Sequence, residues 1–331
     1  MPIHAPSRGR LRAADPEAIA EGAALLRAGE LVGVPTETVY GLGADATSAA
    51  AVGRIFAAKG RPADNPLIVH LADPADLTRV VARVSPLAAD LAARHWPGPL
   101  TLVLDAAEGL PSVTTGGHPT VGVRVPDHPV ARALLATADT PMAAPSANRS
   151  GRPSPTRAEH VLDDLGEHVA LVLDGGPSAV GVESTVVDAR GSRPVVLREG
   201  AVSREALDAE DAGDAGDAGD AVPRAAAPGT RYRHYAPGCE VRLAAPEEVP
   251  ATAARLAAAG HRVGAIAPSA LLPAGLDAAT AAEDPVALAR LLYDGLRAAE
   301  ARGVDVVVVA TVAEEGIGRA VMDRLRRAAA G

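Results

Sequence analysis

Cysteine, lysine, side-chain amides and aromatic rings are all scarce in this chain of 331 residues. The single cysteine, Cys239, excludes an internal disulfide and fits a reducing cytoplasm. Aromatic residues make up 2% of the chain and hydrophobic residues 48%, so we expect a core of Ala, Val and Leu. No positively charged, then apolar, signal segment opens the chain, and the most apolar run, 304–310, is too short to span a bilayer. These absences predict a soluble, cytoplasmic protein that does not use a membrane.

An excess of basic charge is also lacking. The formal net charge is −9, and no region has the surplus of Lys and Arg that a dedicated nucleic-acid binder carries. The overall charge therefore argues against long polyanions as partners. Local groups of Arg and Lys could still bind a small polyanion such as a nucleotide.

Lys59 is the only lysine in the chain, and Asn65 and Asn148 are the only asparagines; glutamine is absent. One interpretation is that an arginine-rich composition left a single lysine on a solvated surface by chance. The other is that this position needs a compact ammonium, which a planar guanidinium cannot replace. All three residues fall in short stretches punctuated by Gly and Pro, namely 59–66 and 145–151. We therefore favour a functional role for them.

The length and the change of composition along the chain predict two domains joined by a linker. The linker is acidic, and 208–220 consist of Asp, Ala and Gly apart from Glu210. We assign 1–205 to a first domain, 206–238 to the linker and 239–331 to a small second domain in which strands and helices alternate, as in parallel α/β folds. In the first domain the patterns predict helices at 15–29, 47–58, 74–82, 86–95 and 156–165, and strands at 31–34, 67–71, 100–104, 121–126, 141–144, 170–173, 182–188 and 194–198. In the second they predict strands at 262–266 and 304–310, and helices at 246–259 and 285–301.

The polar residues of the first domain suit two anionic ligands better than acid–base hydrolysis. A polyphosphate needs cations and oriented amides, commonly with magnesium, and a small carboxylate suits one bidentate arginine. Arg124 lies between valines in a predicted strand, where it is either an edge charge facing water or an anion contact. The chain has no Gly-rich loop ending in Gly-Lys-Ser/Thr, no Gly-x-Gly-x-x-Gly, no Gly-x-Ser-x-Gly turn and no His/Cys metal spacing, so we expect no metal held by the protein alone. The residues by themselves therefore predict an enzyme that binds a nucleotide and a small acid, and nothing more specific.

Several motifs taken together resemble the YrdC-like family of L-threonylcarbamoyladenylate synthases. They are Pro35-Thr36-Glu37-Thr38-Val39-Tyr40-Gly41-Leu42, Lys59-Gly60-Arg61-Pro62, Asn65-Pro66-Leu67 and Ser146-Ala147-Asn148. The resemblance covers roughly 12–203, and His234-Tyr235-Ala236-Pro237 with the trailing α/β domain is similar to the longer, two-domain form of the family. It implies a twisted, mixed sheet with a concave cavity like an open barrel, followed by a small Rossmann-like domain.

The resemblance also implies a reaction and the residues that serve it. L-threonine, bicarbonate and ATP would give L-threonylcarbamoyladenylate and pyrophosphate, and a downstream tRNA threonylcarbamoyl transferase complex would then modify adenosine 37 of tRNAs that read codons beginning with A. The threonine ligands would be Thr38, His70, Arg124, Ala144 (through its backbone) and Ser184. The ATP ligands would be Lys59, Arg61, Asn65, Thr120, Ser146, Asn148, Ser154, Arg198, His234 and Tyr235, with Lys59 and Arg61 as the catalytic pair and the last two as a lid.

Two other functions remain open at this point. The same fold serves as an RNA-binding module, although the acidic balance and the shortage of aromatic residues argue against it here. It also serves as a carbamoyl-transfer module in hydrogenase maturation factors, which carry zinc-finger cysteines that this chain lacks. Direct binding of tRNA, the oligomeric state and the choice between carbon dioxide and bicarbonate are not determined by the sequence.

Overall fold

The computed structural model describes 9–209 and 235–330, and its contacts divide the chain into two compact units. Of the described residues, the first unit contains 9–150, 155–178 and 183–209; the second contains 151–154, 179–182 and 235–330. Two short pieces of the segment that we assigned to the first domain, 151–154 and 179–182, therefore pack with the second unit. The repeat at 210–220, His234 and most of the expected lid lie outside the described residues.

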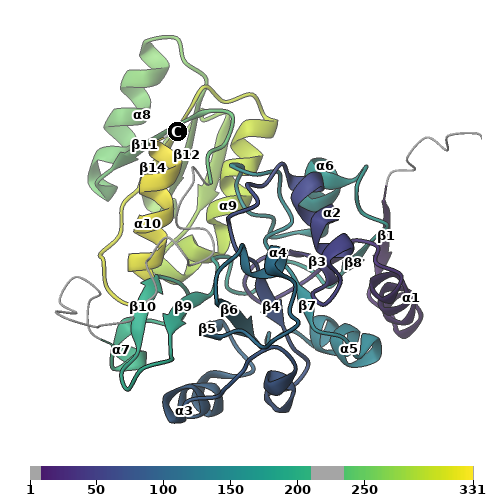
Figure 1. The fold of residues 1–331 in the computed structure, drawn as a ribbon. Coiled ribbons are helices and arrows are strands. Elements are labelled where there is room, and N and C mark those ends of the chain that lie inside the picture. Colours follow the sequence, from purple (N-terminus) through teal and green to yellow (C-terminus); the bar gives the residue numbers. More distant parts are fainter. Residues whose placement is uncertain (1–8, 210–234, 331) are drawn as a thin grey trace, which may run out of the picture. The chain divides into compact units, whose positions relative to one another are not determined.

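The first unit is built on a ten-stranded mixed sheet with the order β1-β8-β2-β3-β7-β4-β6-β5-β9-β10 (Figure 1). Neighbouring strands are parallel in the pairs β1/β8, β2/β8, β4/β6 and β5/β9, and antiparallel in the other five pairs. The mixed α/β fold that we expected is thus confirmed. The strands are β1 (Arg10–Ala13), β2 (Val32–Val34), β3 (Gly41–Asp45), β4 (Ile68–His70), β5 (Leu100–Asp105), β6 (Thr120–Arg124), β7 (Met142–Ala143), β8 (Leu171–Asp174), β9 (Thr185–Asp188) and β10 (Val195–Arg198).

Helices cover this sheet through two separate apolar clusters. α1 and α5 lie side by side (Figure 1) and bury Leu26, Leu134 and Leu135 against Val32, Val34, Leu171 and Leu173. The larger cluster joins α2, α3 and α6 to other strands through Ile55, Leu91, Val161, Leu42 and Leu102. The helices are α1 (Pro16–Arg27), α2 (Ala49–Lys59), η1 (Pro74–Arg79), α3 (Pro86–His95), α4 (Ser112–Thr115), α5 (Pro129–Ala138), α6 (Ala158–Leu165) and α7 (Arg204–Leu207).

Local chemistry explains where these helices begin and end. The Asp15 carboxylate accepts a hydrogen bond from the Ala18 amide at 2.7 Å, and Pro16 occupies the first helical position, as expected for the start of α1. Gly60 ends α2 with a φ of 60°, a left-handed conformation that glycine adopts without strain. The segment that we expected to form an α-helix at 74–82 is instead the short 3₁₀ helix η1, because the chain turns at Val80 and Val81 pairs with Ala106.

The second unit has a four-stranded, fully parallel sheet with the order β11-β14-β12-β13. Its strands are β11 (Glu240–Ala244), β12 (Val263–Ala267), β13 (Ala278–Ala281) and β14 (Val306–Ala310), and its helices are η3 (Pro246–Glu248), α8 (Val249–Ala258), η4 (Ser269–Leu271), α9 (Pro285–Ala301) and α10 (Ile317–Ala329). α8 covers one face of this sheet, where Leu256 packs with Val306, Val308, Ala265 and Ala267. Gly295 of α9 closely approaches Ile266, which alternates with Ala265 and Ala267 along β12 and so points to the other face. The parallel α/β architecture expected for this part is confirmed.

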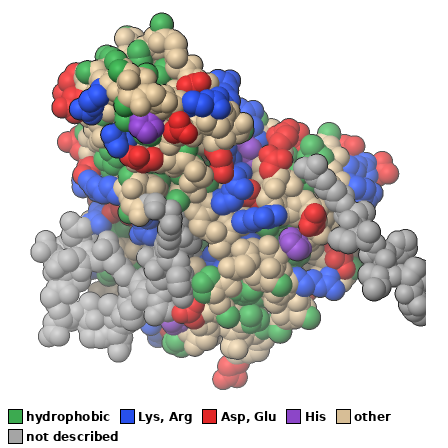
Figure 2. Space-filling model, turned by 90° about the horizontal axis from the view of Figure 1, so that it is seen from above, with side chains coloured by type: hydrophobic (Ala, Val, Ile, Leu, Met, Phe, Trp, Pro, Cys, Tyr) green, Lys and Arg blue, Asp and Glu red, His purple; other side chains and the backbone are tan. Residues whose placement is uncertain are grey.

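Acidic and basic side chains are mixed over the surface that Figure 2 shows, without one continuous basic field on that face. Among the described residues no helix combines the length and the apolar character needed to cross a bilayer.

Candidate active site

The motif 35–40 is a buried loop between β2 and β3 that is fixed by its own hydroxyl groups. Thr36 Oγ1 lies 2.8 Å from Thr38 Oγ1 and donates a hydrogen bond to the Val39 carbonyl at 2.6 Å. Ser178 Oγ donates to the Thr36 carbonyl at 3.0 Å, and the Tyr40 hydroxyl donates to the Gly176 carbonyl at 2.7 Å. These bonds fasten the loop to the segment after β8, so Glu37 and Thr38 are held in defined positions.

Arg124, at the end of β6, brings the loop and the sheet together. Its guanidinium donates to the Gly98 carbonyl at 3.1 Å and to Thr38 Oγ1 at 2.8 Å, and it forms an ion pair with Glu37 Oε1 at 2.5 Å. The side chains of Arg124 and Glu37 are only 4% and 7% exposed. Because β6 lies inside the sheet between β4 and β5, the interpretation of Arg124 as an edge charge facing water is wrong. The structure instead holds a cation in the interior, beside a predicted threonine ligand.

His70 lies next to Arg124, since the two residues are register partners on the parallel strands β4 and β6. Burial lowers the pKa of His70 to about 3, and the positive charge of Arg124 lowers it in the same direction. The ring is therefore neutral at physiological pH. Its Nδ1 is buried without a hydrogen-bond partner among the described residues. A neutral imidazole at this position can exchange a hydrogen bond with a ligand but does not add positive charge.

Ser184 and Arg198 form a second group of predicted site residues. Ser184 Oγ lies 2.8 Å from Thr101 Oγ1 on β5, and Arg198, at the end of β10, donates to the Ser184 carbonyl at 2.8 Å and to its hydroxyl at 3.2 Å. All three side chains are buried. Thus a residue predicted for threonine and one predicted for ATP are in direct contact.

Lys59 forms a third group with the loop that follows β7. It is the last residue of α2, is only 4% exposed, and donates hydrogen bonds to the backbone carbonyls of Ser146 and Asn148. Ser146 Oγ in turn donates to Asn148 Oδ1 at 2.6 Å. The solvated-surface interpretation of the only lysine is therefore wrong. The rare lysine and one of the two asparagines belong to one buried polar cluster.

The other predicted residues lie as follows. Arg61 donates to the carbonyls of Asn65 and Pro66 at 3.2 and 2.9 Å, so it shapes the loop that precedes β4. The Ala144 amide donates to the Ile68 carbonyl at 3.0 Å, which ties the end of β7 to β4. Thr120 is buried at the start of β6, in register with Asp105.

Ser154 and Tyr235 belong to the second unit. Ser154 is buried in the segment 151–154. The Tyr235 ring stacks on Tyr293 of α9, with centroids 5.5 Å apart, and the Arg324 guanidinium carbon lies 5.3 Å from its centre. The remaining predicted residue, His234, lies outside the described residues.

Glu37 was not among the predicted site residues, although it lies inside the motif 35–42 and contacts the predicted residue Arg124. Thr36 and Thr101, which contact Thr38 and Ser184, were not among them either. The signal for Glu37 was its acidic charge in an otherwise uncharged buried loop. Thr101 gave no such signal, because it reads as an ordinary strand residue.

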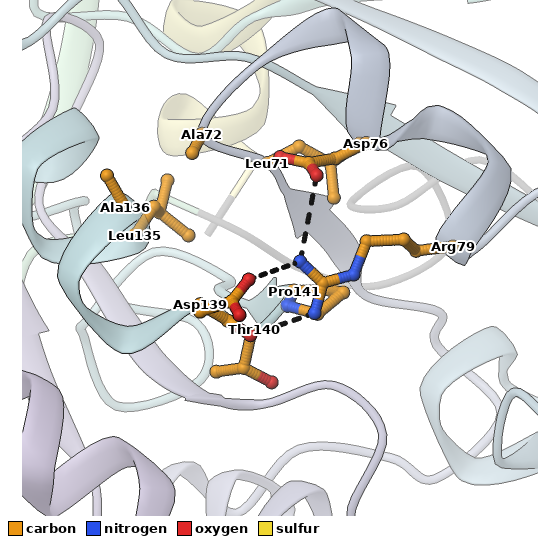
Figure 3. Close-up of a pocket in the computed structure, with 9 residues that line it drawn as sticks. All are labelled: Leu71, Ala72, Asp76, Arg79, Leu135, Ala136, Asp139, Thr140 and Pro141. Carbon is orange, nitrogen blue, oxygen red and sulfur yellow. Dashed lines mark hydrogen bonds and ion pairs between the residues drawn. The ribbon is translucent and has the colours of Figure 1, made fainter.

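A cavity of about 220 Å³ lies elsewhere in the first unit and is lined by none of the predicted site residues. Figure 3 shows Arg79 at this cavity between Asp76 and Asp139, with ion-pair distances of 3.6 and 2.9 Å. Two carboxylates already neutralise its only cation, so this cavity does not suit a nucleotide or a free carboxylate. Within 9–209 and 235–330, no three His, Cys, Asp or Glu side chains come together in a way that could hold a metal ion.

Comparisons with known proteins agree over nearly the whole chain. A family model described as "Telomere recombination", for Sua5, YciO and YrdC, matches 24–200, and a model described as "Threonylcarbamoyl-AMP synthase, C-terminal domain" matches 199–330. The chain is 44% identical to the threonylcarbamoyl-AMP synthase of Pyrococcus abyssi, over 92% of each chain, and 42% identical to that of Bacillus subtilis, over 96% of this chain and 94% of the relative. The crystal structure of P. abyssi Sua5 complexed with L-threonine matches with a TM-score of 0.88 and 41% identity, covering 98% of this chain and 97% of that one.

Proposed function

The chain belongs to the threonylcarbamoyl-AMP synthase family, and we propose that it binds L-threonine and ATP at the buried polar groups around Thr38, Ser184 and Lys59. The observation that carries this proposal is the buried Arg124, which contacts Thr38 and lies in register with the neutral His70. A buried guanidinium beside a hydroxyl and an uncharged imidazole matches a small hydroxylated acid better than it matches a polyphosphate.

For threonine, Arg124 would bind the carboxylate, because a guanidinium offers two parallel N–H donors to a carboxylate. Thr38, His70 and Ser184 would exchange hydrogen bonds with the hydroxyl and amino groups, and the backbone of Ala144 would complete the set. The proposal is supported by the relative whose structure was solved with L-threonine, which is 41% identical over 98% of this chain.

For ATP, Arg61 and Arg198 supply positive charge, Lys59 lies beside Ser146 and Asn148, and Asn65 and Thr120 offer buried polar side chains. Ser154, His234 and Tyr235 complete the proposed set. Magnesium is the usual counter-ion of a polyphosphate. Because the described residues offer no cluster of three metal ligands, we propose that Mg²⁺ arrives bound to the nucleotide.

The proposed reaction asks the protein to position reactants and stabilise charge. The threonine nitrogen, after its ammonium form has lost a proton, attacks carbon dioxide with loss of a further proton, or bicarbonate with loss of water, to form a carbamate. A carbamate oxygen then attacks the α-phosphorus, a new P–O bond forms, and the bond to pyrophosphate breaks. No protein nucleophile is needed, and the cations offset the charge that develops on the phosphates.

The wider setting is part of the same proposal. The product would pass to a downstream tRNA threonylcarbamoyl transferase complex in the cytoplasm. We propose that 1–205 act as the catalytic domain, 206–238 as linker and lid, and 239–331 as a small C-terminal domain. A dedicated RNA-binding role is not favoured, because the net charge is −9 and the relatives at 42–44% identity are enzymes by name.

The test is pyrophosphate release from ATP by the purified chain, with threonine and bicarbonate omitted in turn. We expect release only when both are present. Release that does not depend on threonine would refute the proposal. Salt-sensitive RNA binding without any ATP turnover would favour the RNA-binding alternative.

A further inference from the structure

Glu37 is a buried carboxylate to which none of the assignments above gives a role. It is 6% exposed and lies in the fixed loop beside Thr38. Its Oε1 is 2.5 Å from the Arg124 guanidinium, yet neither carboxylate oxygen has a hydrogen-bond partner among the described residues. The pair is therefore close in distance but poorly directed, and it leaves acceptor capacity unused. Burying such a carboxylate is costly unless donors satisfy it.

The charges around Glu37 identify the kind of donor that is missing. Arg124 is the cation closest to Glu37. His128 is a second neighbour: burial lowers the pKa of its imidazole, and the negative charge of Glu37 raises that pKa to a smaller extent. His70, in register with Arg124 on the neighbouring strand, is neutral. Glu37 and Arg124 thus present one negative and one positive charge side by side in the protein interior. An α-amino acid carries the complementary pair, an ammonium and a carboxylate on the same carbon.

We propose that Glu37 binds the α-ammonium group of the amino-acid substrate while Arg124 binds its carboxylate. This inference rests on the proposed function and deepens it, because it assigns the group that distinguishes an amino acid from a simple hydroxy acid. The ammonium supplies three N–H donors and a positive charge to a carboxylate that lacks hydrogen bonds. It also fixes the position of the nitrogen that later forms the carbamate.

The test compares two ligands that differ only in the amino group, L-threonine and (R)-3-hydroxybutanoate, by isothermal titration calorimetry. We expect wild-type protein to bind threonine at least about tenfold more tightly, as the loss of a charge-assisted hydrogen bond implies. Glu37→Gln should lower the affinity for threonine by about tenfold or more and change that for (R)-3-hydroxybutanoate by less than about threefold. Glu108→Gln, at an exposed position, is the matched control and should change neither.

Each other outcome overturns the inference. If Glu37→Gln weakens both ligands equally, Glu37 only orients Arg124; if it weakens neither, Glu37 does not touch the substrate. Equal affinity of the wild-type protein for both ligands would also refute the inference. This comparison needs no variant, so it remains decisive if Glu37→Gln fails to fold. Failure of the proposed function is distinguishable, because the wild-type protein would then neither bind threonine nor release pyrophosphate in its presence.

Discussion

Replacing Arg124 by methionine should destabilise the first unit mainly through the charge that it leaves behind. The side chain makes two hydrogen bonds, to Gly98 and Thr38, and one ion pair with Glu37, all in the interior. Removing one partner of a buried ion pair typically costs roughly 3–5 kcal/mol, because the other charge remains buried without compensation. We therefore expect Arg124→Met to lower the free energy of unfolding by about 3–5 kcal/mol, a large share of the ~5–15 kcal/mol that a typical protein has.

The double variant Arg124→Met with Glu37→Gln separates this effect from the loss of packing. It removes both charges and keeps similar volumes, so we expect it to be more stable than Arg124→Met alone. Urea denaturation followed by tryptophan fluorescence suits the measurement, because Trp96 is the only tryptophan and is buried in the first unit, where its Nε1 donates to the Leu100 carbonyl at 2.7 Å. A double variant that is no more stable than Arg124→Met would contradict the reasoning.

The same variant has a kinetic prediction. If Arg124 binds the threonine carboxylate, Arg124→Met should raise the KM for threonine more than about tenfold and leave the KM for ATP nearly unchanged. A control at the exposed Arg83 should leave both constants unchanged. An equal rise in both constants would make Arg124 a structural residue.

Rare residues proved informative in the sequence, whereas their partners could not be predicted. Lys59 is the only lysine in the sequence, which indicated that its position requires this residue, and the burial of its side chain supports that interpretation. Its hydrogen-bond acceptors are backbone carbonyls about ninety residues away in the sequence, at Ser146 and Asn148. No local pattern encodes such a contact, because it depends on how β7 is placed in the sheet. The role of Glu37 was missed for a similar reason, since its pairing with Arg124 is a tertiary contact.

Several helices with clear caps were predicted well, whereas α5 (Pro129–Ala138), β1 (Arg10–Ala13) and the glycine-rich β3 were not predicted. α1 begins after Asp15, α3 covers 86–95 as expected, and the parallel second sheet follows from its alternating pattern. β3 was missed, because Gly41 and Gly43 hide the strand inside a motif that looks like a loop. A side chain at Gly43 would approach the Met142 sulfur to about 2.5 Å, so Met142 would have to shift to admit it. Packing between strands, rather than strand propensity, therefore selects the residues of β3.

Three further predictions concern Lys59, His70 and Tyr235. Lys59→Ala should abolish adenylate formation and Lys59→Arg should restore it poorly, since a planar fork does not reproduce a compact ammonium; wild-type turnover by Lys59→Ala in the pyrophosphate assay would exclude a catalytic role. The pKa of His70 is about 3 in the folded state, below the unfolded value of about 6.5, so the stability that the neutral ring contributes is fully present above pH 6.5 and is lost as the pH falls, by about 2 kcal/mol at pH 5. His70→Asn should therefore flatten the pH dependence of the free energy of urea unfolding between pH 6.5 and 5. An unchanged slope would show that His70 is not its source. The Tyr235 ring packs on Tyr293 and under Arg324. Tyr235→Ala should therefore lower the free energy of unfolding of the second unit by about 3–5 kcal/mol. Tyr235→Phe is the control, because it keeps the ring and both ring contacts. Because the single tryptophan reports on the first unit, hydrogen exchange of α9 and α10 is the better measurement here. If Tyr235→Ala leaves that exchange unchanged, the ring does not anchor the chain to the second unit.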